Sequence, residues 1–84
     1  MKFEHIVAAA DEYLEAEFSA GYRDGHGSDI PEPSGNRSAA YIHSFRLGRA
    51  ERAGNPIPYV VSVCEASKIR QKEITNRMAM IASS

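Results

Sequence analysis

The sequence predicts an all-α fold: a small three-helix domain in which a helical hairpin, packed by glycine and aromatic residues, is followed by a C-terminal helix. Three observations indicate this fold. Apolar residues recur at steps of three and four, two segments rich in proline and glycine interrupt that periodicity, and one glycine-aromatic pattern occurs twice. We expect a single domain over residues 1–84, since a chain this short buries only about 60 to 65 per cent of its unfolded surface.

The first helix is expected over about residues 3–25. Its apolar stripe consists of Phe3, Ile6, Val7, Ala10, Leu14, Phe18 and Gly21. The acidic residues that fall away from this stripe are Glu4, Asp11, Glu12 and Glu15. The outer face of the first helix is therefore predicted to be acidic and exposed.

Residues 26–37 are predicted to form a loop. Pro31 and Pro33 cannot continue a helix, and the glycine, serine and asparagine residues around them favour turns. The loop therefore joins the first helix to a second one that is expected to return beside it, as the antiparallel partner of a hairpin.

The second helix is expected over about residues 38–53. Ser38 or Asn36 can cap its first turn, because either side chain can accept a hydrogen bond from the free N–H groups there. A turn at residues 54–57, which contains a glycine and a proline, is predicted to end this helix.

One pattern occurs in both predicted helices: small residue, aromatic residue, arginine, any residue, glycine, basic residue. It spans Gly21 to His26 and again Ser44 to Arg49, and another aromatic residue precedes each copy by three positions. Small residues one helical turn apart let two helix backbones approach closely, while aromatic side chains fill the space beside them. The residues predicted to pack in this way are Gly21, Gly25, Ser44 and Gly48, with Phe18, Tyr22, Tyr41 and Phe45.

The start of the remaining segment has two interpretations, because Tyr59–Val63 is rich in β-branched residues and would suit a short strand. A lone strand would have no partner, so we predict a third helix over about residues 58–82. Ile69 and Met80 project away from its main apolar stripe, beside Ala66, and indicate a second contact surface. The stripe itself, predicted to be buried, comprises Val60, Val63, Cys64, Ser67, Ile74, Met78 and Ile81.

The residue types that carry catalysis or bind metals are poorly placed in this chain. Zinc needs ligands at compact spacing, but the histidines and the lone cysteine are widely separated. Cys64 is expected to be buried and has no adjacent base to activate it. The carboxylates of the first helix lie on an exposed face rather than in the cleft that acid-base catalysis needs. We therefore expect no enzyme, no metal site and no cofactor.

The net charge of −1 hides a division between the two parts of the chain. Residues 1–33 carry eight acidic and two basic residues, whereas residues 34–84 carry three acidic and eight basic ones. The lone cysteine excludes an internal disulfide and no segment is apolar enough to span a membrane, so we expect a cytoplasmic protein. A homodimer stays an open alternative, because a domain this small often needs a partner chain.

Arginines gather in and just before the second helix, where they form the candidate site for an anionic partner. Guanidinium groups bind phosphate through paired hydrogen bonds and stack on bases, and Tyr41 would add a stacking face if it is exposed. Alternatively, the arginines pair with acidic residues of the first helix or with Glu51, or they are only solvated. The candidate RNA-binding residues are Arg37, Tyr41, Arg46, Arg49 and Arg52.

An ordered set of residues runs from the end of the first helix through the second. In chain order it is Gly21, Tyr22, Gly25, Gly27, Pro31, Pro33, Arg37, Ser38, Tyr41, Ser44, Phe45 and Arg46. With this layout, the stretch from about residue 18 to residue 52 resembles ribosome modulation factor, a family of small bacterial proteins that bind the small ribosomal subunit. The third helix is not covered. The resemblance implies a non-enzymatic translation regulator that binds the ribosome or structured RNA through the arginines.

A second hypothesis is a protein-binding module, such as an adaptor or a small inhibitor encoded by a mobile element. In this case Asp11, Glu12 and Glu15, on the outer face of the first helix, would contact a basic protein surface. Small size, divided charge and the lack of a catalytic pattern suit both hypotheses. Substitution of the arginines or of the carboxylates should distinguish them.

Overall fold

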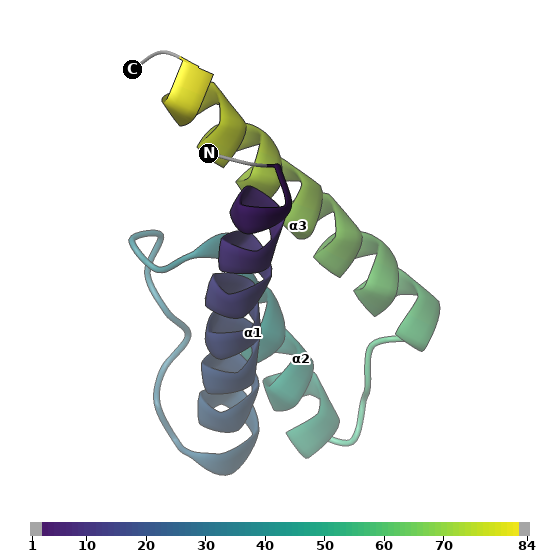
Figure 1. Ribbon diagram of the computed structural model, residues 1–84. Helices are drawn as coiled ribbons and strands as arrows, with labels where there is room; N and C mark the ends of the chain where they lie inside the picture. Colours follow the sequence, from purple (N-terminus) through teal and green to yellow (C-terminus); the bar gives the residue numbers. More distant parts are fainter. Residues whose placement is uncertain (1–2, 83–84) are drawn as a thin grey trace.

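The computed structural model describes residues 3–82 and contains three helices, α1 (Phe3–Gly27), α2 (Ala39–Arg52) and α3 (Tyr59–Ala82) (Figure 1). There is no strand in this part of the chain, so the predicted all-α class is confirmed. The helix at the start of α3 was the favoured of the two interpretations there, and it is confirmed as well. The outermost residues of the predicted domain, 1–2 and 83–84, lie outside the described residues.

The α1–α2 pair is held together by the repeated glycine-aromatic pattern. A Cβ atom added at Gly21 would collide with the main-chain carbonyl of Tyr41, and one at Gly25 would collide with the carbonyl of Phe45. The predicted close approach of the two backbones at these glycines is therefore confirmed. Gly48 makes the reciprocal contact, since its Cβ would lie 2.6 Å from the carbonyl oxygen of Tyr22.

The same contacts show that α1 and α2 run in the same direction, so the predicted antiparallel hairpin is wrong. Gly21 meets Tyr41 and Gly25 meets Phe45, and a constant offset of this kind arises between parallel helices. The connecting loop, residues 28–38, makes this possible by running back beside the pair before α2 begins (Figure 1). An extended chain of that length reaches roughly 35 Å, well beyond the return distance of about 15 Å along α1.

Ser38 marks the point where the loop ends and α2 begins. Its hydroxyl oxygen accepts a hydrogen bond from the Tyr41 N–H at 3.1 Å, and its hydroxyl group donates to the Glu17 carboxylate at 2.7 Å. Ser38 has the extended backbone of a helix N-cap. Of the two predicted caps, Ser38 is the one that the structure uses.

The core lies mainly between α1 and α2. The buried apolar side chains of the described residues are Ile6, Ala10, Leu14, Ala40, Tyr41, Phe45 and Ile74. Ile74 is the contribution of α3, which crosses α1 in the opposite direction (Figure 1). None of the helices described is both long enough and apolar enough to cross a membrane.

The face of α3 that meets the α1–α2 pair is not the predicted one. Of the predicted stripe, Ile74 is 5% exposed, but Val60 is 71%, Val63 42%, Met78 41% and Ile81 42% exposed. Cys64, which was expected to be buried, is exposed too. The half-buried positions are Ser62, Ala66, Ile69, Glu73 and Arg77.

The physical reason lies in the polar and small residues of α3. The Arg70 guanidinium donates two hydrogen bonds to the Asp11 carboxylate, at 2.7 and 3.1 Å, on the side of α3 that faces α1. The small side chain of Ala66 on that side permits close approach. The predicted second contact surface is therefore the inward one at Ala66 and Ile69, whereas Met80 is exposed.

Candidate functional site

The arginines of α2 contact the returning loop. Arg52 donates to the Ser28 carbonyl at 2.6 Å and to the Asp29 carboxylate at 2.7 Å. One turn earlier, Arg49 donates to the carbonyls of Gly25, Ser28 and Ile30 at 2.8, 3.1 and 2.6 Å. Another turn earlier, Arg46 donates to Glu32 at 2.7 Å. We call Arg46, Arg49 and Arg52 the arginine ladder.

The arginine ladder runs along the loop in order. As α2 is followed backward from Arg52 to Arg46, the acceptors advance from Ser28 to Glu32. The loop is thus fastened along α2 at successive helical turns. Internal pairing was one of the alternatives for these arginines, and the structure shows it with different acceptors from those proposed, because they come from the loop rather than from α1 or Glu51.

Arg49 is the central member of the ladder. Its three acceptors include carbonyl groups at and just beyond the end of α1, which have no partner within the helix. Its guanidinium also lies 4.8 Å from the centroid of the Phe45 ring. These contacts give Arg49 a structural role as a cap of α1 and a support of the loop.

Tyr41 is not exposed, which corrects its assignment as a base-stacking residue. It is 2% exposed, and the Arg37 guanidinium lies 3.5 Å from its ring centroid. Its hydroxyl group donates to the Asp24 carboxylate at 2.6 Å, which raises the pKa of Tyr41 and lowers that of Asp24. A ring enclosed in this way has no face to offer a base.

Glu51 serves a different partner from the one considered in the sequence analysis. Its carboxylate accepts a hydrogen bond from the Tyr22 hydroxyl group, which raises the pKa of Tyr22. The Tyr22 ring stacks on His26 with 5.5 Å between centroids. Both aromatic residues therefore belong to the contact between α1 and α2, near the end of the pair.

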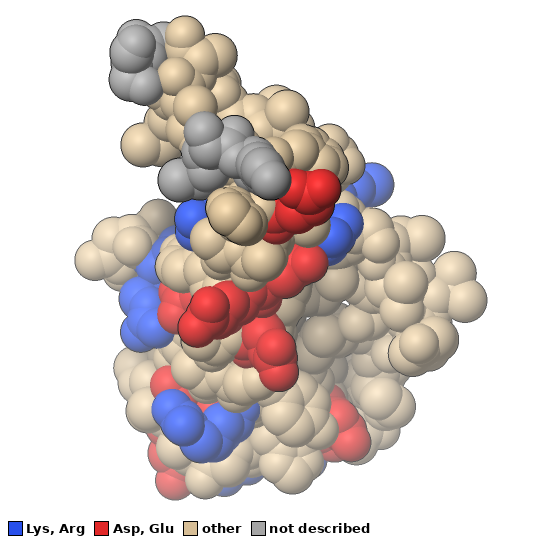
Figure 2. Space-filling model, viewed as in Figure 1, with Lys and Arg blue, Asp and Glu red and all other residues tan. Residues whose placement is uncertain are grey.

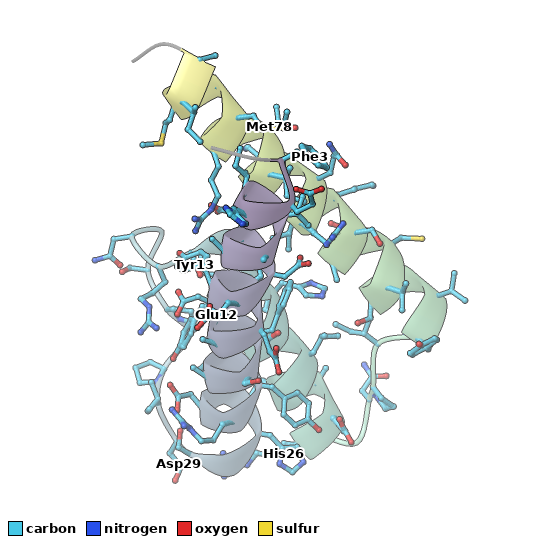
Figure 3. All side chains as sticks on the ribbon, in the orientation of Figure 1. Phe3, Glu12, Tyr13, His26, Asp29 and Met78 are labelled. Carbon is cyan, nitrogen blue, oxygen red and sulfur yellow. The ribbon has the colours of Figure 1, made fainter. Side chains whose placement is uncertain are left out.

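The three acidic residues proposed for protein binding differ in their surroundings. The Arg70 hydrogen bonds hold the pKa of Asp11 below its usual range, and this carboxylate fastens α3 to α1. Glu12 and Glu15 are exposed, and neither has an ion pair or hydrogen bond within the described part of the chain. Figure 2 shows acidic side chains gathered over α1, and Figure 3 shows Glu12 pointing away from the helix.

His43 is a half-buried titratable group between α2 and α3. Its Nε2 atom is buried and has no hydrogen-bond partner among the described residues, and its ring meets Phe18 edge-on at 6.0 Å between centroids. Burial lowers the pKa of His43, although the charge of Glu65 and the backbone of Ser62 act in the opposite direction. Within residues 3–82, no three histidine, cysteine or carboxylate side chains gather in a way that could hold a metal ion.

A shallow groove separates α1 from α3. Its volume is about 390 Å³, and its lining includes Leu14 and Phe18 of α1 and Val63 of α3, with Asp11 and Glu15 at its margin. Sequence reasoning missed this groove because it placed Val63 in the core. The Ala66–Ile69 spacing was the signal for the inward side of α3.

Comparison with known proteins identifies no relative. No protein-family model matches the chain, and neither a curated protein nor a solved structure matches it.

Proposed function

We propose that this protein is a non-enzymatic interaction module that binds a basic protein surface through Glu12 and Glu15 on α1. One observation carries the proposal: these carboxylates are exposed without a partner among the described residues, whereas the guanidinium groups of the arginine ladder contact the protein's own loop. Exposed charge that makes no internal contact contributes to binding without first breaking an existing interaction.

The neighbouring carboxylates support this distinction. Asp11 binds Arg70, Glu17 accepts from Ser38 and Asp24 accepts from Tyr41, so each of them has a structural partner. Glu12 and Glu15 lie outside that set. Binding through them should be faster at low ionic strength, because surface charges are screened over about 8 Å at physiological salt.

The test is capture of partners from host lysate on the immobilised protein, with and without ribonuclease. We expect capture of a ribonuclease-resistant protein that the Glu12→Gln and Glu15→Gln variants each weaken. Glu65→Gln is the matched control, because it removes one carboxylate from an exposed site on α3 whose ion pair with Lys68 spans 3.5 Å. Equal capture by all three variants and the wild type would contradict the proposal.

A second candidate function is binding of ribosomal or other structured RNA, as the resemblance to ribosome modulation factor implies. This candidate is supported by the exposure of Arg46, the first residue of the arginine ladder. The Arg46 side chain is 64% exposed, and that of its partner Glu32 is 58% exposed. A surface ion pair of this kind contributes little to stability, so a phosphate group could replace Glu32. Arg37 and Arg52 would complete the contact.

Ribosome co-sedimentation tests the second candidate. Arg46→Glu should abolish co-sedimentation and leave the fold intact, because its ion pair is exposed. Added salt should weaken the association steeply if phosphate contacts hold it. Unchanged co-sedimentation of Arg46→Glu, or none for the wild type, would remove this candidate.

A further inference from the structure

The groove between α1 and α3 has an apolar lining that is open to solvent. Leu14 and Phe18 of α1 contribute to this lining, together with Val63 and Ala66 of α3. Leu14 is buried, Phe18 and Ala66 are half-buried and Val63 is 42% exposed. Figure 2 shows the surface hollowed between α1 and α3, with acidic side chains on the α1 side of the hollow. A recessed apolar surface of this kind suits the apolar side chains of a partner.

The charged residues that line the groove leave one carboxylate without a partner. Arg70 and Asp11 pair with each other at 2.7 Å. Glu15 lies one turn farther along α1 and is exposed, with no ion pair or hydrogen bond among the described residues. Glu12, one turn before Glu15, extends the negative charge outside the groove. Charge complementarity therefore favours an occupant that carries basic residues beside apolar ones.

A second groove between the same two helices differs in charge. Lys68 and Lys72 line it, and its one carboxylate among the lining residues, Glu73, is paired with Arg77 at 2.7 Å. A basic partner would meet like charge there, which disfavours binding. Of the two grooves, the one that contains Glu15 is therefore the better match for a basic partner.

The direction and length of the groove fit a helix. Asp11, Glu15 and Ser19 follow one another along its α1 margin at steps of four, so this margin runs along the helix for about 12 Å. Two turns of a partner helix have about the same length. The helices α1 and α3 pass each other in opposite directions (Figure 1), and a third helix can lie along such a pair, as in a helix bundle. Ser19 and Ser67 are small and exposed, which permits close approach.

We propose that the groove between α1 and α3 binds an amphipathic basic helix of a partner protein. The apolar face of that helix would lie on Leu14, Phe18 and Val63, and its lysine or arginine residues would lie beside Glu15. This inference rests on the proposed function and specifies the form of the partner, a helix with one apolar face. Apolar contact would supply most of the affinity, whereas the carboxylates would select a basic partner.

A peptide of defined pattern tests the site. The probe is a synthetic peptide of about 18 leucine and lysine residues, with leucines at steps of three and four so that they form one helical face. We expect it to bind the full chain in fluorescence anisotropy and to shift the NMR methyl signals of Leu14 and Val63. A peptide of the same composition in shuffled order, and one with glutamate in place of lysine, should each bind about tenfold more weakly or worse. Equal binding of either control peptide, or no binding of the probe, would overturn the proposal.

Two matched variants locate the binding. Val63→Lys places a positive charge in the groove and should weaken binding of the probe about tenfold or more, because like charges then meet. Val60→Lys is the control, since it makes the same change one turn earlier on α3, at a side chain that is 71% exposed and is not part of the groove lining. Both side chains are exposed, and circular dichroism checks that both variants fold. Equal losses in the two variants would contradict binding in the groove.

Partner capture from host lysate distinguishes failure of this inference from failure of the proposed function. We expect Val63→Lys to weaken capture along with Glu12→Gln and Glu15→Gln. If the two carboxylate variants weaken capture and Val63→Lys does not, the proposed function stands and the groove proposal fails. If none of the three weakens capture, both fail. Self-association of the chain that Val63→Lys abolishes would assign the groove to a second copy, and the proposal would again be wrong.

Discussion

The Arg49 guanidinium donates a hydrogen bond of 2.8 Å to the carbonyl of Gly25, so the second copy of the repeated pattern caps the helix that carries the first. Gly25 also packs against the Phe45 backbone. The same turn of α2 therefore approaches α1 closely and supplies a hydrogen-bond donor to a carbonyl at the C-terminal end of α1. The same guanidinium holds the loop at Ser28 and Ile30. Parallel packing of α1 and α2 and the path of the loop are thus joined at one side chain.

Replacement of Arg49 should therefore cost more stability than replacement of Arg46. Arg49→Ala should lower the free energy of unfolding by about 2 kcal/mol, because carbonyls at the end of α1 and in the loop lose a charged donor. Arg49→Lys should lower the free energy of unfolding by most of the same amount, since an ammonium group cannot reproduce the planar set of N–H donors of the guanidinium group. Arg46→Ala should change stability by less than about 0.5 kcal/mol, because its pair is exposed. Urea unfolding measures these differences, and equal losses at Arg46 and Arg49 would contradict the structural role of Arg49.

Gly25 and Gly27 of α1 should respond differently to replacement by alanine. Gly25→Ala should destabilise the protein by about 2 kcal/mol or more, because the new methyl group meets main-chain atoms of Phe45 that cannot move independently. Gly27→Ala is the control, since a Cβ there meets nothing within 4 Å, and it should be neutral or slightly stabilising. A tolerated alanine at Gly25 would show that the two helices do not approach this closely.

His43 should make stability depend on pH below 6.5, its ordinary pKa. Burial lowers the pKa of His43 in the folded protein, so the unfolded chain binds the proton first as the pH falls. This contribution is complete above the unfolded pKa and is lost as the pH falls through the lowered folded value. Thermal unfolding across this range should show the loss in the wild type and a smaller one in His43→Phe. Identical pH profiles would show that His43 is not desolvated.

The pairing of Asp11 with Arg70 should stabilise α3 in a pH-dependent way. The pKa of Asp11 lies below its ordinary 3.8 because Arg70 donates to the carboxylate. The stabilisation is therefore present above the unfolded pKa and lost as the pH falls through the lower, folded one. Asp11→Asn should unfold at a lower temperature than the wild type at neutral pH and at the same temperature in strong acid. Faster amide hydrogen exchange in α3 of the variant would show that the loss of stability is located in α3. If the difference in unfolding temperature persisted in strong acid, it would arise from altered packing and not from the ion pair.

Local features of the fold were predictable because their signals lie within a few residues. The three helices, the Ser38 cap and the glycine contacts follow from periodicity, capping chemistry and the repeated small residues. The direction of α2 does not, because glycine spacing specifies close approach and leaves parallel and antiparallel packing equally possible. Asp29 and Glu32 offered a signal, since three residues of extended loop span about the same length as the six helical residues from Arg46 to Arg52.

The candidate site was only partly predictable for a related reason. Most acceptors of the arginine ladder are main-chain carbonyls, which every residue has, so no residue type marks them in advance. The side of α3 that faces α1 carries long-range contacts, Arg70 with Asp11 and Arg77 over the Tyr13 ring, together with small residues. Apolar periodicity alone favoured the side of α3 with more apolar residues, and most of those residues are exposed.

The central claim is that exposed carboxylates on α1, rather than the arginine ladder, bind the partner. Its most direct test is to compare two double variants in ribonuclease-treated host lysate, Glu12→Gln with Glu15→Gln and Arg46→Gln with Arg52→Gln. We predict that the carboxylate pair loses the captured protein while the arginine pair retains it. Capture that survives loss of the carboxylates and disappears with the arginines would contradict the account.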